Sequence, residues 1–194
     1  ATRLKTLFQR LSELGVQRDG DERDAARTRV TNRLAVLLFV CTGIYLPFFI
    51  SHNATKAALV CSMGFLIYPA SLLLNHVRRH QTAATLLIVY LNFMLGFCAL
   101  YFGREAEMDV GFFALACFPL IILDGSISKA LIGLTIMLPI VAFEFLNLWA
   151  FDHVPHFGDP VKIPYLLEIC AAPVTFLTWL FPGGFLVAAN AKAE

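Results

Sequence analysis

Six apolar stretches, separated by short polar segments, dominate this chain of 194 residues. They cover residues 34–50, 57–74, 83–102, 110–123, 130–151 and 163–187. Because an α-helix rises about 1.5 Å per residue, roughly twenty apolar residues cross the hydrocarbon core of a bilayer. Most of the stretches reach this length once their flanks are included, and the fourth is short. We therefore predict an all-α, polytopic membrane protein with six transmembrane helices within residues 30–187.

The composition supports a membrane protein over a soluble one. The chain is 58% hydrophobic and only 15% charged, whereas soluble domains are nearer half apolar and a quarter charged. The net charge of +1 says nothing about nucleic acid, but no run of lysine and arginine interleaves with aromatic residues as a nucleic-acid groove requires, so we expect no nucleic-acid partner. The five cysteines all lie in apolar stretches, and none forms a CxxC pair. A cysteine in such a position usually acts as a small hydrophobic side chain. We expect no disulfide framework, no metal site and no cofactor.

The distribution of charge predicts the orientation of the chain. Basic residues precede the first stretch, at Arg23, Arg27, Arg29 and Arg33, and fill the loop at residues 76–80. Loops rich in arginine and lysine stay in the cytoplasm, so both segments should be cytoplasmic. Residues 104–109 are net acidic and should be external. With six crossings both termini are cytoplasmic, and we predict a multi-pass protein of the bacterial inner membrane.

The two ends of the chain differ from its centre. Residues 1–29 comprise a helix with leucines and Phe8 on one face and basic residues on the other, followed by a charged connector. This amphipathic helix suits either the cytoplasmic membrane surface or a protein partner, and both interpretations stay open. Residues 188–194 follow the last apolar stretch, where a membrane helix would join a cytoplasmic one, and the chain stops abruptly there, so we expect a part of a longer protein. Pro182, Gly183 and Gly184 just before this segment predict a coupling hinge.

The chain carries no residue pattern that would make it an enzyme. No lysine or histidine lies inside an apolar stretch, which removes a retinal Schiff base and paired haem ligands. The GxSxG, HExxH and P-loop motifs are also missing from the sequence. We therefore expect a non-catalytic chain that forms the membrane part of an enzyme or a signalling protein.

A few polar residues in the outer halves of the predicted helices are candidates for a ligand site. An ionisable group within a membrane helix costs roughly 2.5–3.5 kcal/mol, so each is a functional hypothesis by default. Two carboxylates there would favour a cationic or hydrogen-bonding ligand. The alternative is structural, with a glutamate neutral or paired with an arginine. The candidate set is Glu144, Asn147, Glu168, Asn92, Tyr101 and Arg104.

The depth of these polar residues separates two function classes. A receptor needs one polar pocket that opens outward, whereas a transporter needs polar groups along the whole depth of the membrane. We expect the inner halves of the helices to be almost wholly apolar, which favours a receptor. The alternative is a small transporter or channel subunit in which Glu144, Asn92 and Glu168 form a polar pathway.

Three passages suggest a family. Residues 26–34 read Ala-Arg-Thr-Arg-Val-Thr-Asn-Arg-Leu, the third stretch closes with Tyr-Phe-Gly-Arg-Glu at 101–105, and the chain ends Ala-Asn-Ala-Lys-Ala-Glu. Together they resemble the six-helix membrane anchors of bacterial class III adenylate cyclases and related sensor histidine kinases. The resemblance implies a receptor domain for signal transduction in cAMP biosynthesis, embedded in the lipid bilayer as a homodimer. A small ligand or lipid would bind at its outer side. Residues 188–194 would be the start of a coupling helix that leads to a cytoplasmic output domain.

Overall fold

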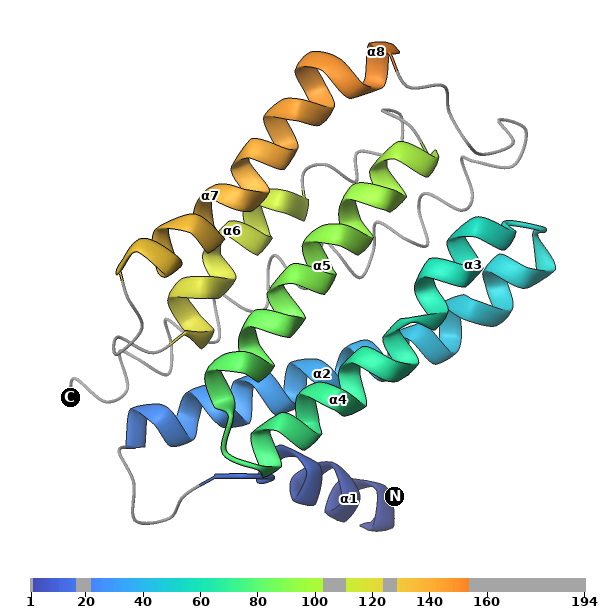
Figure 1. Cartoon of the computed structure of the whole chain (residues 1–194). Helices are drawn as coiled ribbons and strands as arrows, with labels where there is room; N and C mark the ends of the chain where they lie inside the picture. The colour runs from blue at the N-terminus through green and yellow to red at the C-terminus, as the bar shows by residue number, and fades with distance from the viewer. Residues whose placement is uncertain (1, 17–21, 103–110, 124–128, 154–194) are drawn as a thin grey trace.

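The computed structural model describes residues 2–16, 22–102, 111–123 and 129–153, and every element in these ranges is helical (Figure 1). An N-terminal helix precedes a bundle of roughly antiparallel helices. In chain order the elements are α1 (Thr2–Ser12), α2 (Glu22–Ser51), α3 (Thr55–Ser62), α4 (Gly64–His76), α5 (His80–Phe102), α6 (Gly111–Ile122), α7 (Lys129–Phe145), the π-helical turn η3 (Leu146–Ala150) and α8 (Phe151–His153).

Four helical segments in the described ranges are long and apolar enough to cross a membrane. They are Asp24–Ser51, Thr55–His76, His80–Phe102 and Ala130–His153. They correspond to the first, second, third and fifth apolar stretches of the sequence. The fourth stretch forms the shorter helix α6, and the sixth lies outside the described residues. Four candidate spans are therefore shown, and the full set of six stays a prediction.

Helix α5 lies at the centre of the bundle. It contains no proline, unlike α2, α4, α6 and α7. It packs against α2, α3, α4, α6, α7 and η3. Proline removes a backbone donor and tends to bend a helix, so the one long span without it can lie straight against many neighbours.

The surface of the bundle is more apolar than parts of its interior. Large side chains such as Ile44, Leu66 and Leu134 are exposed. Polar side chains, among them Asn32 and Asn75, are fully buried. Water would not tolerate so large an apolar surface, whereas lipid tails would. This distribution, with the four long apolar helices, identifies a membrane-embedded helical protein.

The middle of the bundle is tightly packed around Gly64. This glycine opens α4, and a Cβ added to it would lie 2.7 Å from the ring of Tyr68 and 2.9 Å from Thr42 Oγ1. The Tyr90 hydroxyl donates to the carbonyl of Val60 at 3.0 Å. Small residues at such positions allow helices to approach closely in a membrane. The polar groups of α2, α4 and α5 therefore meet here without open space between them.

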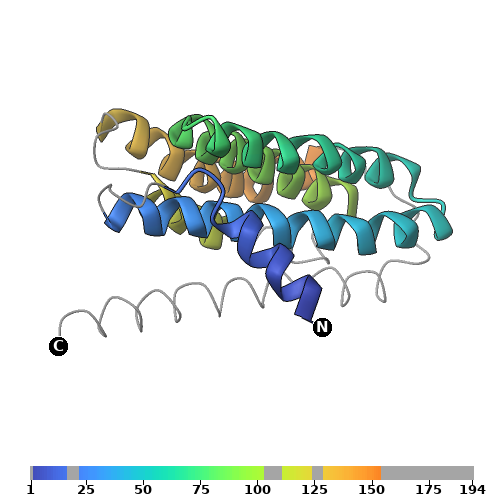
Figure 2. The same ribbon diagram turned by 90° about the horizontal axis from the view of Figure 1, so that it is seen from below.

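Helix α1 is inclined to the bundle, and its N-terminal end stands away from it (Figure 2). It packs against α2. Leu7 and Phe8 are exposed, while Ser12 at its C-terminal end is buried. A helix is thus present where the sequence predicts one, and its placement on a membrane surface stays a prediction.

Candidate functional site at the basic end of the bundle

The two basic segments of the sequence meet at one end of the bundle. The start of α2 lies beside the turn between α4 and α5, because Asn32 bonds to Asn75 and Thr28 lies 3.4 Å from His80. The prediction that both segments face the same side of the membrane requires this arrangement. The side itself, cytoplasmic or external, stays a prediction.

A continuous set of side-chain hydrogen bonds crosses this end. His80 Nδ1 lies 3.2 Å from Asn75 Oδ1, and Asn75 Nδ2 donates to Asn32 Oδ1 at 2.7 Å. Because an amide oxygen can only accept, the His80 nitrogen in this bond must carry the hydrogen. We call His80, Asn75 and Asn32 the amide relay. Both asparagines are 0% exposed, so the relay is part of the core.

The amide relay ends on the N-terminal segment. Asn32 Nδ2 donates to the backbone carbonyls of Ser12, at 3.2 Å, and Leu14, at 2.8 Å. The last carbonyls of a helix have no N–H partner within it, and Asn32 supplies one. Gly15 follows with φ of +73°, and any Cβ there would overlap the carbonyl oxygen of Asn75. The end of α1 is therefore docked on α2 and α4 by hydrogen bonds and by close backbone approach.

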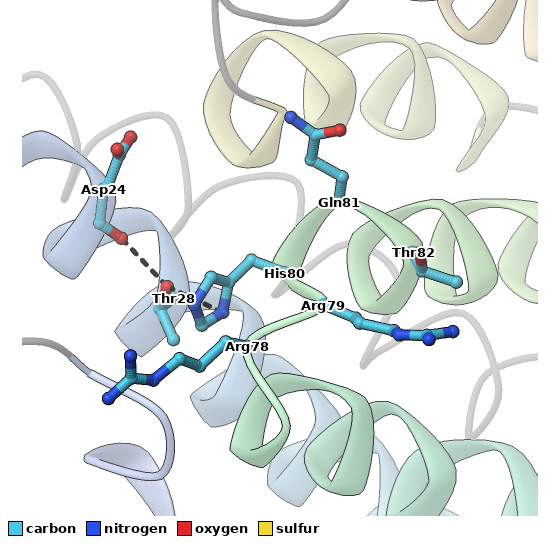
Figure 3. A pocket seen from close by; sticks show the side chains of 7 residues that line it. All are labelled: Asp24, Thr28, Arg78, Arg79, His80, Gln81 and Thr82. Carbon is cyan, nitrogen blue, oxygen red and sulfur yellow. Dashed lines mark hydrogen bonds between the residues drawn. The ribbon is translucent and has the colours of Figure 1, made fainter.

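Beside the relay lies a cavity of about 510 Å³. It is lined by Asp24 and Thr28 of α2, by Arg78 and Arg79 of the turn, and by residues 80–82, the first of α5 (Figure 3). The guanidinium groups of the two arginines extend to opposite sides of His80. Thr28 donates to the carbonyl of Asp24 at 2.9 Å. The volume is within the usual range of small-ligand pockets.

Some arginines near this cavity have a carboxylate partner, and others have none among the described residues. Arg29 pairs with Glu13 at 3.0 Å, and Arg27 lies 3.8 Å from Asp24. Neither Arg78 nor Arg79 forms a side-chain hydrogen bond or ion pair with another residue in the described ranges. Arg78 adopts a left-handed backbone conformation, with φ of 62°. The two cations outnumber the one carboxylate, so the cavity favours an anion.

The outer candidate residues are only partly within the described ranges. Asn92 is 7% exposed, and its Nδ2 donates to the carbonyl of Ile88 in its own helix. Its Oδ1 is buried and has no hydrogen-bond partner in the part of the chain described here. Tyr101 is buried and stacks on Phe97, with ring centroids 5.9 Å apart.

The other outer candidates lie on α7, in η3, or outside the described ranges. Glu144 is exposed on α7. Asn147 lies in η3 and donates to the carbonyl of Phe143 at 3.1 Å. The other members, with the predicted hinge, lie outside the described residues: Arg104, Glu168, Pro182, Gly183 and Gly184. A ligand site formed by these residues stays a prediction.

Sequence reasoning missed the relay and its contact with α1. Asn32 and Asn75 lie just outside the first and second apolar stretches, where we expected only anchoring charges. An amide directly next to an apolar stretch was the available signal, because a membrane helix rarely buries such a group without a partner. Because both amides lie outside the apolar stretches, the expectation of almost wholly apolar inner halves stays a prediction.

Comparisons with known proteins do not identify a family for this chain. No family model matches the chain, and neither a curated protein nor a solved structure does.

Proposed function

We propose that this chain is the membrane-anchoring sensor domain of a bacterial signalling protein that regulates a cytoplasmic output domain, such as a nucleotide cyclase. The amide relay is the observation that carries the proposal. It joins α2, α4 and α5 to the carbonyls at the end of α1. A relative movement of these helices would change the bonds to α1. A shift in the equilibrium between two arrangements of the bundle would therefore change the position of α1, the predicted cytoplasmic segment.

The packing around Gly64 supports an anchor over a transporter. Its backbone has no room for a Cβ, since Tyr68 and Thr42 are within 3 Å of that position. A substrate pathway through α2–α5 would need space at this level. Transporters usually place such space near the bilayer midplane, where helices are interrupted. The polar groups at this level bond to protein atoms instead, as Tyr90 does with Val60.

A transporter or channel subunit is the second candidate function. The buried Oδ1 of Asn92, which lacks a partner among the described residues, favours it. An unpaired amide oxygen in a membrane interior is available to a passing polar substrate. In that reading Asn92 acts together with Glu144 and Glu168 along a polar pathway.

The assembly and ligand of the sensor follow from the resemblance to cyclase anchors. Class III cyclases form their active site between two chains, so the domain acts as a homodimer in the lipid bilayer. Its ligand, a small molecule or lipid, would bind at the outer side near Glu144 and Asn92. The chain itself performs no catalysis.

A fusion experiment tests the proposal. The chain is joined after Glu194 to a soluble class III cyclase catalytic domain and expressed in bacteria that lack their own cyclase. Asn75→Ala should change cellular cAMP about fivefold at equal membrane abundance, a typical coupling between sites. Ser62→Ala is the control, because Ser62 bonds only to the carbonyl of Leu59 in its own helix. Equal cAMP in the parent, Asn75→Ala and Ser62→Ala fusions would reject the sensor role.

A further inference from the structure

We propose that the cavity between α2 and the α4–α5 turn binds a phosphate group, with Arg78 and Arg79 as its principal ligands. The first argument is the state of these two side chains. Both are exposed, and neither has a carboxylate partner in the ranges that the structure describes. Arginine presents a planar set of donors that matches phosphate oxygens. Both arginines line the cavity, with their guanidinium groups on opposite sides of His80 (Figure 3), and together they supply its positive charge.

The remaining lining adds donors and a favourable field. The cavity lies at the N-terminus of α5, a helix of 23 residues. The first N–H groups of a helix have no partner within it, and the helix dipole favours an anion at this end. The hydroxyls of Thr28 and Thr82 and the amide of Gln81 also line the cavity. Phosphate oxygens can accept from the Thr82 hydroxyl and the Gln81 amide, whereas the one hydroxyl hydrogen of Thr28 is donated to the carbonyl of Asp24.

One carboxylate lies at the rim, and its position weakens the repulsion that it would cause. Asp24 is paired with Arg27 at 3.8 Å. In Figure 3 its carboxylate points away from His80 and from both turn arginines. Its negative charge is therefore partly compensated by Arg27.

The position of the cavity makes a lipid headgroup one possible source of the phosphate group. Arg78 and Arg79 directly precede the candidate span His80–Phe102, so they lie at the level of the lipid headgroups. A basic pocket at this depth is suited to an anionic headgroup. A soluble phosphate compound offers the same chemistry. The two sources are separated by experiment.

The purified chain is placed in nanodiscs of phosphatidylcholine with a minor fraction of phosphatidic acid. Retained phosphatidic acid is then measured by native mass spectrometry. The double variant Arg78→Gln/Arg79→Gln should retain about tenfold less of it, as expected for the loss of one to two charge-assisted hydrogen bonds. In a second arm, the chain in pure phosphatidylcholine nanodiscs is dialysed against radiolabelled inorganic phosphate.

The double variant Arg10→Gln/Arg33→Gln is the charge-matched control. Both residues are exposed and neither lines the cavity. It should retain phosphatidic acid within about twofold of the parent chain. Binding of phosphate that depends on Arg78 and Arg79 in the dialysis arm alone would support the site with a soluble source. Equal losses in both double variants, or no loss in either arm, would overturn it and leave only general attraction of basic loops to the membrane.

Discussion

At the scale of single residues, Asn32 uses both the oxygen and the nitrogen of its side-chain amide. Its oxygen accepts from Asn75, and its nitrogen donates to two carbonyls. A buried amide left without partners costs about 1–3 kcal/mol. Asn32 and Asn75 are both fully buried, so water does not reach the groups that would lose a partner. Removing the side chain of Asn32 therefore leaves the carbonyls of Ser12 and Leu14 without the donor that it supplies, at this cost in free energy.

Asn32→Ala should lower the free energy of unfolding by about 1–3 kcal/mol. The measurement is reversible unfolding in mixed micelles with increasing sodium dodecyl sulfate. Thr31→Ala is the matched control, because Thr31 is also buried but its hydroxyl bonds only to the carbonyl of Arg27 in the same helix. That carbonyl keeps its helical partner in the variant. Equal losses in the two variants would show that burial, and not the relay, accounts for the effect.

At the scale of elements, the docking of α1 depends on one glycine. Gly15 combines a positive φ with a backbone approach to Asn75 that leaves no room for a Cβ. Both features penalise every other residue type. The surface pair Arg29–Glu13 adds little, since exposed ion pairs contribute at most about 1 kcal/mol. The orientation of α1 therefore follows from Gly15 and Asn32.

Gly15→Ala should release α1 from the bundle. Spin labels at Arg10→Cys and Val77→Cys, both exposed positions, report the distance between α1 and the end of α4 by pulsed EPR. In a background without the native cysteines, the parent should give one narrow distance distribution, and Gly15→Ala a broader and longer one. Gly43→Ala is the control, because a Cβ at Gly43 meets nothing within 4 Å. A narrow, unchanged distribution in Gly15→Ala would contradict this account.

Most of the described elements could be predicted from the sequence, because a membrane helix is specified locally. The stretch at 83–102 is α5 almost unchanged, and α2 extends earlier than its apolar stretch because the charged connector is already helical. The site could not be predicted in the same way. Asn32 and Asn75 are 43 positions apart, and no local pattern says which sides of two helices will meet.

At the scale of the whole molecule, the two ends of the bundle have different chemistry. One end carries the turn with Arg78 and Arg79. The opposite end has the short turn at residues 52–54 and the stacked rings of Phe49 and Phe102, with centroids 6.1 Å apart. Arginine-rich loops remain in the cytoplasm during insertion. The asymmetry thus predicts the sidedness of the protein.

Asn53 and Arg79 allow this sidedness to be tested, because they flank opposite ends of the candidate span Thr55–His76 and both are exposed. Each is replaced by cysteine in a background without the native cysteines. A membrane-impermeant maleimide should label Asn53→Cys in intact cells freed of their outer membrane. It should label Arg79→Cys only after the inner membrane is permeabilised, because we predict that the arginine turn faces the cytoplasm. The labelling of both variants after permeabilisation controls for accessibility. Labelling of Arg79→Cys in intact cells, with Asn53→Cys protected, would reverse the orientation and place the phosphate cavity outside.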